Sequence, residues 1–457
     1  MTFKKTILLF YGLFSEEQSY DWIPYSPLFI YARLKAAGFN PIIIHEYKDR
    51  DYEPIFKKYK KDTLLFGVSA MTGYQIKSAL KAISTFKKHA NYQVPVIWGG
   101  AHATAMPRNT LENKHADYVC VGPARNNLED FAKELQKGKA QESNFPHILS
   151  SDYFSASYEN RYYGEDSKYD LSNFPSFCFD DFDFSYLLTD NLVLSYTASV
   201  GCPGTCTFCS WGSKRHPWSA LPLKRVLDDI EYLVKRYRLK SIWFADSELS
   251  ISKDYLLSLA QGIIDRKLNI YWRCNARVME LGKYNKTDFA LLEKSGLDRF
   301  FLGIENMNLQ VQKIFRKIIK AEFVYNILEK MKDFDIQVMM AFIFGNPEGP
   351  LNDLEENREF LSKCQKINQN VKFQIGFYTP YPGTPMADLA ESNGYIAPQS
   401  LVEYSESPFF LDVNRSVKAR IPWFTAEDST NYIKRFYRLF PKIDSEPEWN
   451  WRGKVRH

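Results

Sequence analysis

The feature that most constrains the fold of this chain is the regular alternation of short apolar runs with longer, helix-like segments. The pattern occupies two blocks, residues 1–140 and 191–394, and residues 141–190 between them are polar and rich in tyrosine. Strands separated by helices of about 10–15 residues indicate βαβ units, which build parallel sheets. The sequence therefore predicts two α/β domains joined by a linker, then an extension over residues 395–457 whose role stays open.

The first block has the pattern of a doubly wound, Rossmann-like sheet with helices on both faces. Five strands are expected at the apolar runs 7–11, 41–45, 64–69, 94–98 and 118–121. In sheets of this kind the ligand binds beyond the carboxyl ends of the strands. We therefore expect a ligand site among the loops that follow these runs.

The second block repeats a strand and a helix six times. Its strands are expected at residues 192–196, 241–245, 270–274, 300–303, 338–344 and 373–378. Six repeats fit a partial parallel (β/α)6 barrel better than a closed barrel of eight. The chemistry of such barrels takes place at the carboxyl ends of the strands.

Three of the seven cysteines, Cys202, Cys206 and Cys209, follow the first expected barrel strand with the spacing CxxxCxxC. Thiolates are the usual ligands of iron–sulfur clusters, and three of them leave one iron of a four-iron cluster free to bind a cofactor. A structural zinc ion needs a fourth ligand, for which only His216 is near, and the spacing fits no finger pattern. The sequence predicts a 4Fe–4S cluster here. The other cysteines are expected to be structural: Cys120, Cys178, Cys274 and Cys364.

This motif, with the aromatic Phe208 before its last cysteine, resembles that of the radical S-adenosylmethionine superfamily, and the resemblance extends over roughly residues 190–390. It implies that residues at successive strand ends hold S-adenosylmethionine. The expected residues are Phe208, Asp246, Ser247, Glu248, Arg273, Asn275, Arg277, Glu305, Phe344 and Tyr378. Three alternatives stay open: Glu248 as a carboxylate favoured by a helix dipole, Arg277 in a structural ion pair, and a structural role for Glu305, whose burial would be costly without a partner.

The first block is similar to the cobalamin-binding domain found in one branch of that superfamily, on the stretches 67–73, 95–104 and 117–122. The resemblance implies cobalamin contacts from Ser69, Met71, Thr72, Gly99, Gly100, His102 and Gly122. Many cobalamin proteins ligate cobalt with a histidine after the first strand, but residues 12–21 contain none. The cobalt is therefore expected to lack a histidine ligand on its lower face. A structural role for His102, and loss of the ligand by the whole domain, stay open.

Together the two resemblances imply an enzyme whose reduced cluster cleaves S-adenosylmethionine to methionine and a 5′-deoxyadenosyl radical. With cobalamin it would methylate an unactivated carbon of a small-molecule or peptide substrate. A reducing protein such as flavodoxin or ferredoxin would supply electrons. The alternatives are a cobalamin-bound cyclase or rearrangement enzyme, a cobalamin-independent radical enzyme, and a non-enzymatic iron–sulfur sensor or electron carrier.

Composition argues against several other classes of protein. The net charge is only +5 over 457 residues, without the concentrated basic stripe of a nucleic-acid-binding protein. No run approaches the roughly 20 apolar residues that a membrane helix needs. Few, unevenly placed cysteines do not form a secreted disulfide framework. We therefore expect a cytoplasmic protein with neither nucleic acid nor membrane as a partner.

Overall fold

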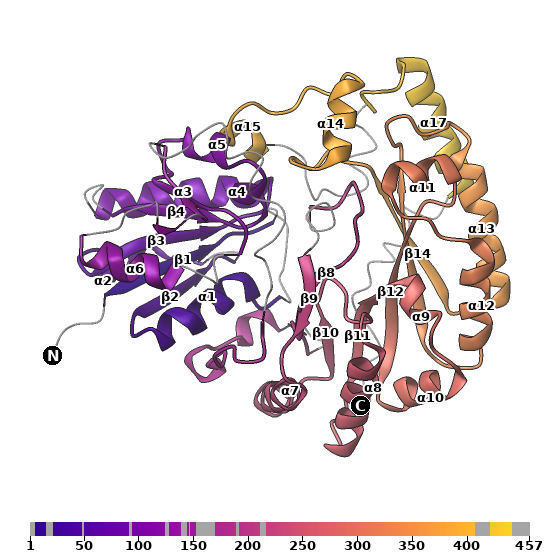
Figure 1. Cartoon of the computed structure of the whole chain (residues 1–457), viewed down its shortest axis with the longest axis horizontal. Helices are drawn as coiled ribbons and strands as arrows, with labels where there is room; N and C mark the ends of the chain where they lie inside the picture. The colour runs from indigo at the N-terminus through magenta and orange to yellow at the C-terminus, as the bar shows by residue number, and fades with distance from the viewer. Residues whose placement is uncertain are drawn as a thin grey trace.

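The computed structural model describes residues 5–14, 22–47, 50–90, 94–123, 128–138, 144–145, 147–151, 170–188, 192–210, 216–406 and 421–440. Two α/β domains lie side by side, and the segment that carries α14 (Pro385–Ser392) and α15 (Leu401–Glu406) spans the gap between them (Figure 1). Among these residues, no helix combines the length and the apolar character needed to cross a membrane.

The N-terminal domain is a doubly wound sheet, as predicted. Its six strands have the order β2-β1-β3-β4-β5-β6, and all neighbours are parallel except β5 and β6. The strands are β1 (Thr6–Tyr11), β2 (Asn40–His45), β3 (Thr63–Ser69), β4 (Val96–Gly99), β5 (Tyr118–Cys120) and β6 (Ile148–Leu149). The order reverses between β1 and β3, so the loops after these two strands flank the crevice in which doubly wound sheets bind ligands.

Helices cover both faces of this sheet. They are α1 (Tyr25–Ala36), α2 (Glu53–Tyr59), α3 (Tyr74–His89), α4 (Ala101–Ala105), α5 (Pro107–Leu111) and α6 (Leu128–Gln136). On one face, Phe86 of α3 packs on Phe66 of β3 and Phe56 of α2, with ring centroids 5.0 and 5.4 Å away. The helical spacing of Ile76, Ala79, Ile83 and Phe86 creates this buried stripe.

The second domain is the predicted partial barrel. Its six parallel strands have the order β14-β13-β12-β11-β10-β7. They are β7 (Val193–Tyr196), β10 (Ser241–Phe244), β11 (Tyr271–Ala276), β12 (Leu297–Glu305), β13 (Gln337–Phe344) and β14 (Val371–Phe377). The helices between them are α7 (Leu223–Tyr237), α8 (Lys253–Asp265), α9 (Val278–Leu281), α10 (Lys286–Lys294), α11 (Leu309–Phe315), α12 (Ala321–Met331) and α13 (Asp353–Ile367). One face of each strand packs on the helices, and the other faces the inside of the barrel.

A short antiparallel hairpin, which the sequence did not predict, follows the first barrel strand. It pairs β8 (Ser199–Cys202) with β9 (His216–Ala220). The hairpin places Cys202 at the end of a strand whose partner leads directly into α7. It therefore fixes where the loop of three cysteines leaves the barrel.

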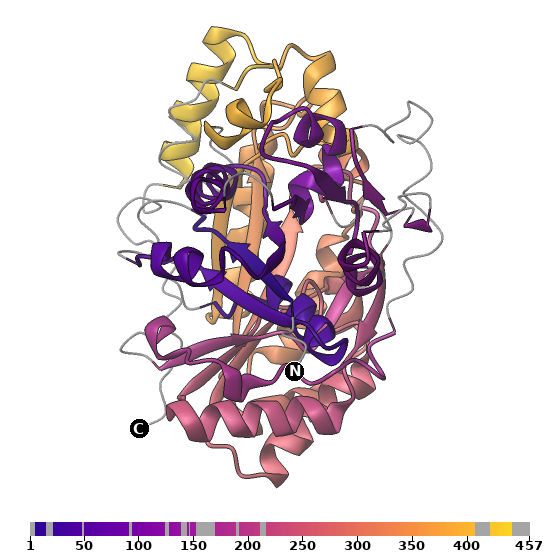
Figure 2. The same ribbon diagram turned by 90° about the vertical axis from the view of Figure 1, so that its left-hand side faces the viewer.

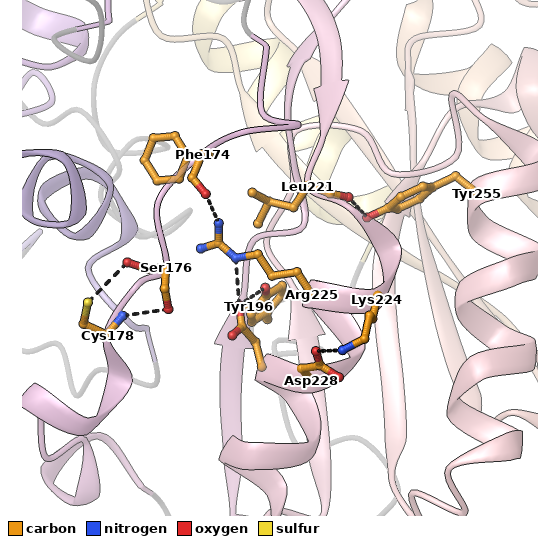
Figure 3. Close-up of polar contacts among 10 residues, drawn as sticks. Phe174, Ser176, Cys178, Tyr196, Leu221, Lys224, Arg225, Asp228 and Tyr255 are labelled. Carbon is orange, nitrogen blue, oxygen red and sulfur yellow. Dashed lines mark hydrogen bonds and ion pairs between the residues drawn. The ribbon is translucent and has the colours of Figure 1, made fainter. Parts of the chain in front are cut away.

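The linker is held firmly where the structure describes it. Arg225 of α7 donates a hydrogen bond of 2.6 Å from Nη1 to the carbonyl of Phe174 (Figure 3). Its guanidinium also lies 4.7 Å from the ring centroid of Phe177. The same two rings pack on Phe29 of α1, each with centroids 4.9 Å away. The linker thus fills the interface between α1 and α7.

Residues after β1 also reach the barrel. The backbone N–H of Ile23 donates to Oγ of Ser195 at 2.9 Å, and the ring of Trp22 lies 4.2 Å from that of Trp243. Ile23 and neighbouring apolar residues belong to the same core as the barrel strands. Turned by 90°, the ribbon shows the first domain standing directly in front of the barrel (Figure 2). The two domains therefore share buried surface.

The described parts of the C-terminal extension pack on both domains. Helix α15 packs on α3 of the first domain, whereas α17 (Ala426–Leu439) packs on α13 of the barrel. The backbone carbonyl of Gln399 accepts a hydrogen bond of 2.7 Å from Nδ2 of Asn109. The extension is thus part of the two-domain structure.

Candidate active site

The loop that carries Cys206 and Cys209 is anchored by its central residues. Thr207 donates from its backbone N–H to the carbonyl of Phe315 at 3.1 Å and from Oγ1 to the carbonyl of Ile314 at 2.6 Å. Its own carbonyl accepts from the N–H of Met386 at 3.2 Å. The end of α11 and the start of α14 therefore hold the loop through Thr207, and the anchoring uses none of the thiols.

The thiols of Cys202, Cys206 and Cys209 are all half-buried on this loop. Burial raises the pKa of Cys206, and the positive charges of Lys317 and Arg277 act in the opposite direction. The three thiols lie in the same region of the structure. They are not close enough together to form a metal site, since no three His, Cys, Asp or Glu side chains within the described ranges do so. His216, the candidate fourth ligand of a zinc site, pairs with Cys202 in the hairpin.

Glu305 ends β12 with a left-handed backbone, at φ 65°. Its Oε1 forms an ion pair of 2.8 Å with Nζ of Lys317, and only 12% and 19% of the two side chains are exposed. Burial alone lowers the pKa of Lys317, but the charge of Glu305 and the hydrogen bond to it raise the pKa above its ordinary value. The partner that a buried Glu305 requires is therefore Lys317, twelve residues further on, which sequence reasoning missed.

Gly303 lies directly beneath this ion pair. A Cβ added there would lie 2.2 Å from Oε1 of Glu305 and 2.7 Å from Nζ of Lys317. The pair therefore needs a glycine two residues before Glu305, because any larger side chain at position 303 would displace the carboxylate or the ammonium group.

Glu248 is buried, and burial raises its pKa to about 7 although hydrogen bonds from Ser250 act to lower it. Its Oε1 accepts from the N–H and Oγ of Ser250, at 3.0 and 2.5 Å. The helix-dipole alternative is wrong, because α8 begins at Lys253 and is capped by Ser252. Arg277 lies close by, with its N–H donating to Oγ of Ser250 at 3.0 Å.

The guanidinium of Arg277 lies against the cluster loop. A Cβ at Gly204 would be 3.8 Å from both of its Nη atoms and 3.4 Å from Sγ of Cys202. Among the described residues Arg277 has no ion-pair partner, so the structural ion pair considered from the sequence is absent there. A cation beside the thiols remains available to an anionic group such as the carboxylate of S-adenosylmethionine.

Asp246 supports the local backbone. Its carboxylate accepts from the N–H groups of Ala198 and Ser199 and from Oγ of Ser199, and burial raises its pKa to about 7. Its carbonyl accepts from Nδ2 of Asn275 at 2.7 Å. The Asp246 carboxylate thus holds the turn between β7 and β8, whereas the side chain of Ser247 is exposed.

Two predicted contacts of S-adenosylmethionine lie elsewhere. Arg273 points toward the amino ends of the strands, where Nη2 contacts Oγ of Ser241 at 3.1 Å and Oδ2 of Asp298 at 3.3 Å. Phe344 is fully buried on the helix-facing side of β13, where its ring packs on Phe436 of α17. Both assignments are wrong, because the strand alternation directs Phe344 outward and a long-range acidic partner holds Arg273 at the barrel base.

Tyr378 and Phe208 do come together. Both belong to one small apolar cluster at the carboxyl ends of the barrel strands, together with Phe315, Ile343 and Trp423. The rings of Phe208 and Phe315 lie 4.7 Å apart, and those of Tyr378 and Trp423 lie 5.6 Å apart. This cluster, here called the aromatic wall, stands next to the loop of cysteines.

At the carboxyl edge of the first domain, Ser69 and Gly99 line one narrow, mainly apolar pocket. A Cβ on Gly122 would meet nothing within 4 Å, so this residue borders open space that a flat ligand needs, whereas a Cβ on Gly99 would be in ordinary contact with the carbonyl of Val68 at 3.7 Å. Gly100 differs, because a Cβ there would lie 2.6 Å from the carbonyl of Ala70. That glycine serves the packing of its own loop.

Gln75 is a residue of this edge that sequence reasoning missed. Its Nε2 donates to the carbonyl of Gly12 and its Oε1 accepts from the N–H of Met71, both at 2.8 Å. It therefore joins the loops after β1 and β3 across the crevice. No local sequence signal marks it, since its partners lie on two different loops.

His102 has the structural role that the sequence left open. It is fully buried, its Nδ1 lies 3.0 Å from Oγ1 of Thr72, and its ring packs edge-on against Tyr404. Burial lowers its pKa to about 3. His102 and Thr72 thus stabilise the loop after β3, and the cobalamin contacts of Ser69, Met71 and Gly122 stay predictions.

Comparison with protein families assigns both domains. The model of the radical SAM superfamily matches residues 196–361, and the model of the B12 binding domain matches residues 16–132. An uncharacterized methyltransferase from Pyrococcus horikoshii is 24% identical over 413 residues, which are 86% of this chain and 82% of that protein. The anaerobic magnesium-protoporphyrin IX monomethyl ester cyclase of Rubrivivax gelatinosus is 23% identical over 385 residues, 82% of this chain and 67% of the cyclase.

Solved structures share the two-domain fold. The radical S-adenosylmethionine methyltransferase TsrM from Kitasatospora setae aligns with a TM-score of 0.68 at 15% identity, covering 86% of this chain and 78% of TsrM.

The residues present fit the cofactors that these domains bind. Three thiols stand on one anchored loop, a cation without an ion-pair partner among the described residues lies beside them, and Gly122 borders open space at the carboxyl edge of the first sheet. The chain therefore belongs to the radical S-adenosylmethionine enzymes that carry a B12-binding domain, with a 4Fe–4S cluster, S-adenosylmethionine and cobalamin as its cofactors.

Proposed function

We propose that this enzyme transfers a methyl group from S-adenosylmethionine, with the help of cobalamin, to an unactivated carbon of a small-molecule or peptide substrate. The observation that carries the proposal is that the carboxyl-end loops of both sheets meet. Gly383, in the turn after β14, lies against Ala105 of α4, which follows β4; a Cβ on Gly383 would be 3.1 Å from that of Ala105. A substrate between the domains would have access to both cofactors.

Each cofactor supplies chemistry that side chains lack. The cluster with S-adenosylmethionine supplies a radical able to remove hydrogen from an unactivated carbon, and cobalamin supplies a carrier for the methyl group. The chain's own residues bind, orient and exclude water. Arg277 offers a cation, Lys317 holds Glu305 in place, and Thr207 fixes the cysteine loop. Similarity to an uncharacterized methyltransferase and to the hopanoid C-3 methylase of Methylococcus capsulatus, 26% identical over 187 residues, supports methyl transfer.

The second candidate is ring closure without methyl transfer. Three magnesium-protoporphyrin cyclases are similar to this chain, so the alternative has direct support. Such an enzyme would use the same cluster, but the methyl group would stay on the sulfur atom of the methionine that cleavage releases.

The fate of S-adenosylmethionine separates the two candidates even without a known substrate. The reconstituted enzyme would be incubated with a reductant, with and without cobalamin, and the products separated by mass. Methyl transfer predicts S-adenosylhomocysteine that depends on cobalamin, since this product forms only when the methyl group leaves. Production of 5′-deoxyadenosine and methionine alone, with or without cobalamin, would contradict methyl transfer and favour cyclisation.

The electron source and the compartment are part of the proposal. A low-potential one-electron donor such as flavodoxin or ferredoxin would reduce the cluster. A cytoplasmic location would keep the thiols reduced, in accord with the few, unevenly placed cysteines of the sequence.

A further inference from the structure

The strand end formed by Gly345, directly after β13, is fixed by side chains from outside both matched domains. Its N–H donates to the hydroxyl of Tyr432 at 3.1 Å, and its carbonyl accepts from Nε1 of Trp423 at 3.0 Å. Gly345 has a left-handed backbone, at φ 65°, and a Cβ there would lie 3.0 Å from Cδ1 of Ile421. Trp423 and Tyr432 thus pair both backbone polar groups of Gly345, the residue that directly follows the strand.

The hydroxyl of Tyr432 extends this contact to a second strand end. It donates to Oδ1 of Asp353 at 2.7 Å, and Oδ2 of Asp353 accepts from Nδ2 of Asn306 at 2.8 Å. Asn306 directly follows Glu305 and also donates to the carbonyl of Ile343 at 3.2 Å. Tyr432, Asp353 and Asn306 are all essentially buried. One continuous network therefore joins α17 to the carboxyl ends of β12 and β13.

Trp423 reaches the third strand end through its ring. The ring lies 5.6 Å from that of Tyr378, whose N–H donates to the carbonyl of Phe344 at 2.8 Å. Tyr378 and Trp423 belong to the aromatic wall, which also contains Phe208 of the cysteine loop. The C-terminal segment thus builds part of an apolar, aromatic cluster beside the cysteine loop.

The chemistry of S-adenosylmethionine matches this arrangement. Its amino-acid end chelates the open iron, and its other end is a flat aromatic base on a ribose. Such a base needs an apolar or aromatic face and fixed backbone polar groups nearby. The aromatic wall provides the face, and the strand ends after β12, β13 and β14 provide the backbone groups.

We propose that Trp423 and Tyr432 are positioning residues that hold the ends of β12, β13 and β14 for the nucleoside part of S-adenosylmethionine. The C-terminal segment therefore completes the cofactor site of the barrel. This inference rests on the S-adenosylmethionine site of the proposed function and does not depend on methyl transfer or on cobalamin.

The test compares Tyr432→Phe and Trp423→Phe with wild-type enzyme carrying a reconstituted cluster. Tyr437→Phe, on the same helix, is the matched control. Calorimetry would give the Kd of S-adenosylhomocysteine, and the spectrum of the reduced cluster would report binding of free methionine, which has no nucleoside. We expect the Kd of S-adenosylhomocysteine to rise about tenfold in both variants. This is the effect of losing roughly one hydrogen bond that holds the site in its binding geometry. Methionine binding and the control should match wild type.

Three results would overturn the inference. If both variants melt at lower temperature but keep the wild-type Kd, the two residues are only structural. If methionine binding weakens as much as that of S-adenosylhomocysteine, the effect is not specific to the nucleoside. If wild-type enzyme with a full cluster fails to bind S-adenosylhomocysteine, both the inference and the proposed function fail, whereas the first two results leave the function intact.

Discussion

Replacing Gly303 by alanine tests the packing of the Glu305–Lys317 pair most sharply. The new Cβ would lie 2.2 Å from Oε1 of Glu305 and 2.7 Å from Nζ of Lys317. An ordinary van der Waals contact is about 3.5 Å, so the carboxylate has to retreat by more than about 1 Å. The 2.8 Å ion pair cannot keep its geometry after such a shift.

The expected loss of unfolding free energy is about 1–2 kcal/mol, the lower part of the range for overpacking, because both obstructing atoms end flexible side chains. The loss of activity should be larger, since Glu305 would leave the strand end at which we expect S-adenosylmethionine to bind. Urea unfolding would give the stability, and 5′-deoxyadenosine formed under reductant would give the activity. Gly376→Ala is the stability control, because a Cβ there meets nothing closer than 3.9 Å.

A double-mutant cycle decides whether the Glu305–Lys317 ion pair is the reason that Gly303→Ala lowers the unfolding free energy. In a Lys317→Ala background one obstructing atom is gone and Glu305 is free to turn, so Gly303→Ala should cost at least about 0.5 kcal/mol less. The reasoning would be refuted if Gly303→Ala lowered the unfolding free energy equally in both backgrounds. It would also be refuted if the Gly303→Ala enzyme cleaved S-adenosylmethionine at the wild-type rate.

Three further predictions concern the cluster, the buried carboxylates and the first domain. Cys206→Ala should lose iron and form no 5′-deoxyadenosine, whereas Cys274→Ala, in the core, should keep both; equal iron in the two variants would exclude Cys206 as a ligand. Burial raises the pKa of Glu248 to about 7, so the protonated form is favoured in the folded state, and stability should fall as the pH rises from about 4 to about 7. Glu248→Gln should make this fall smaller in urea midpoints between pH 5 and pH 8, and an unchanged fall would disprove the assignment. Gly100→Ala should destabilise by about 2–3 kcal/mol, because its φ is 91° and the Ala70 carbonyl is 2.6 Å away, whereas Gly122→Ala should cost about 1 kcal/mol; equal losses in thermal unfolding would contradict this.

Much of the fold follows from local pattern. All five predicted strands of the first sheet and all six of the barrel form at or near the predicted residues, because a parallel strand buried on both faces is a nearly continuous apolar run. The pattern failed for β6, which has two residues, and for the hairpin of β8 and β9, whose residues lack an apolar run.

The site was less predictable because its contacts are long-range. Lys317 follows a helix and a left-handed turn before it meets Glu305, and Tyr432 is 79 residues from Asp353. Only the error at Phe344 was avoidable from sequence. In β13, Phe344 has the same parity as Met340 and Phe342 and so faces the helices, which leaves Ile343 on the inner face.

The central claim is that one chain holds both a cluster and cobalamin. The most direct measurement is iron, cobalt and corrin content after anaerobic reconstitution with iron, sulfide and hydroxocobalamin, by metal analysis and absorbance. The account predicts about four irons and about one cobalamin per chain. Four irons with no retained cobalamin would leave the radical barrel standing but would contradict the two-cofactor account and remove the basis for methyl transfer.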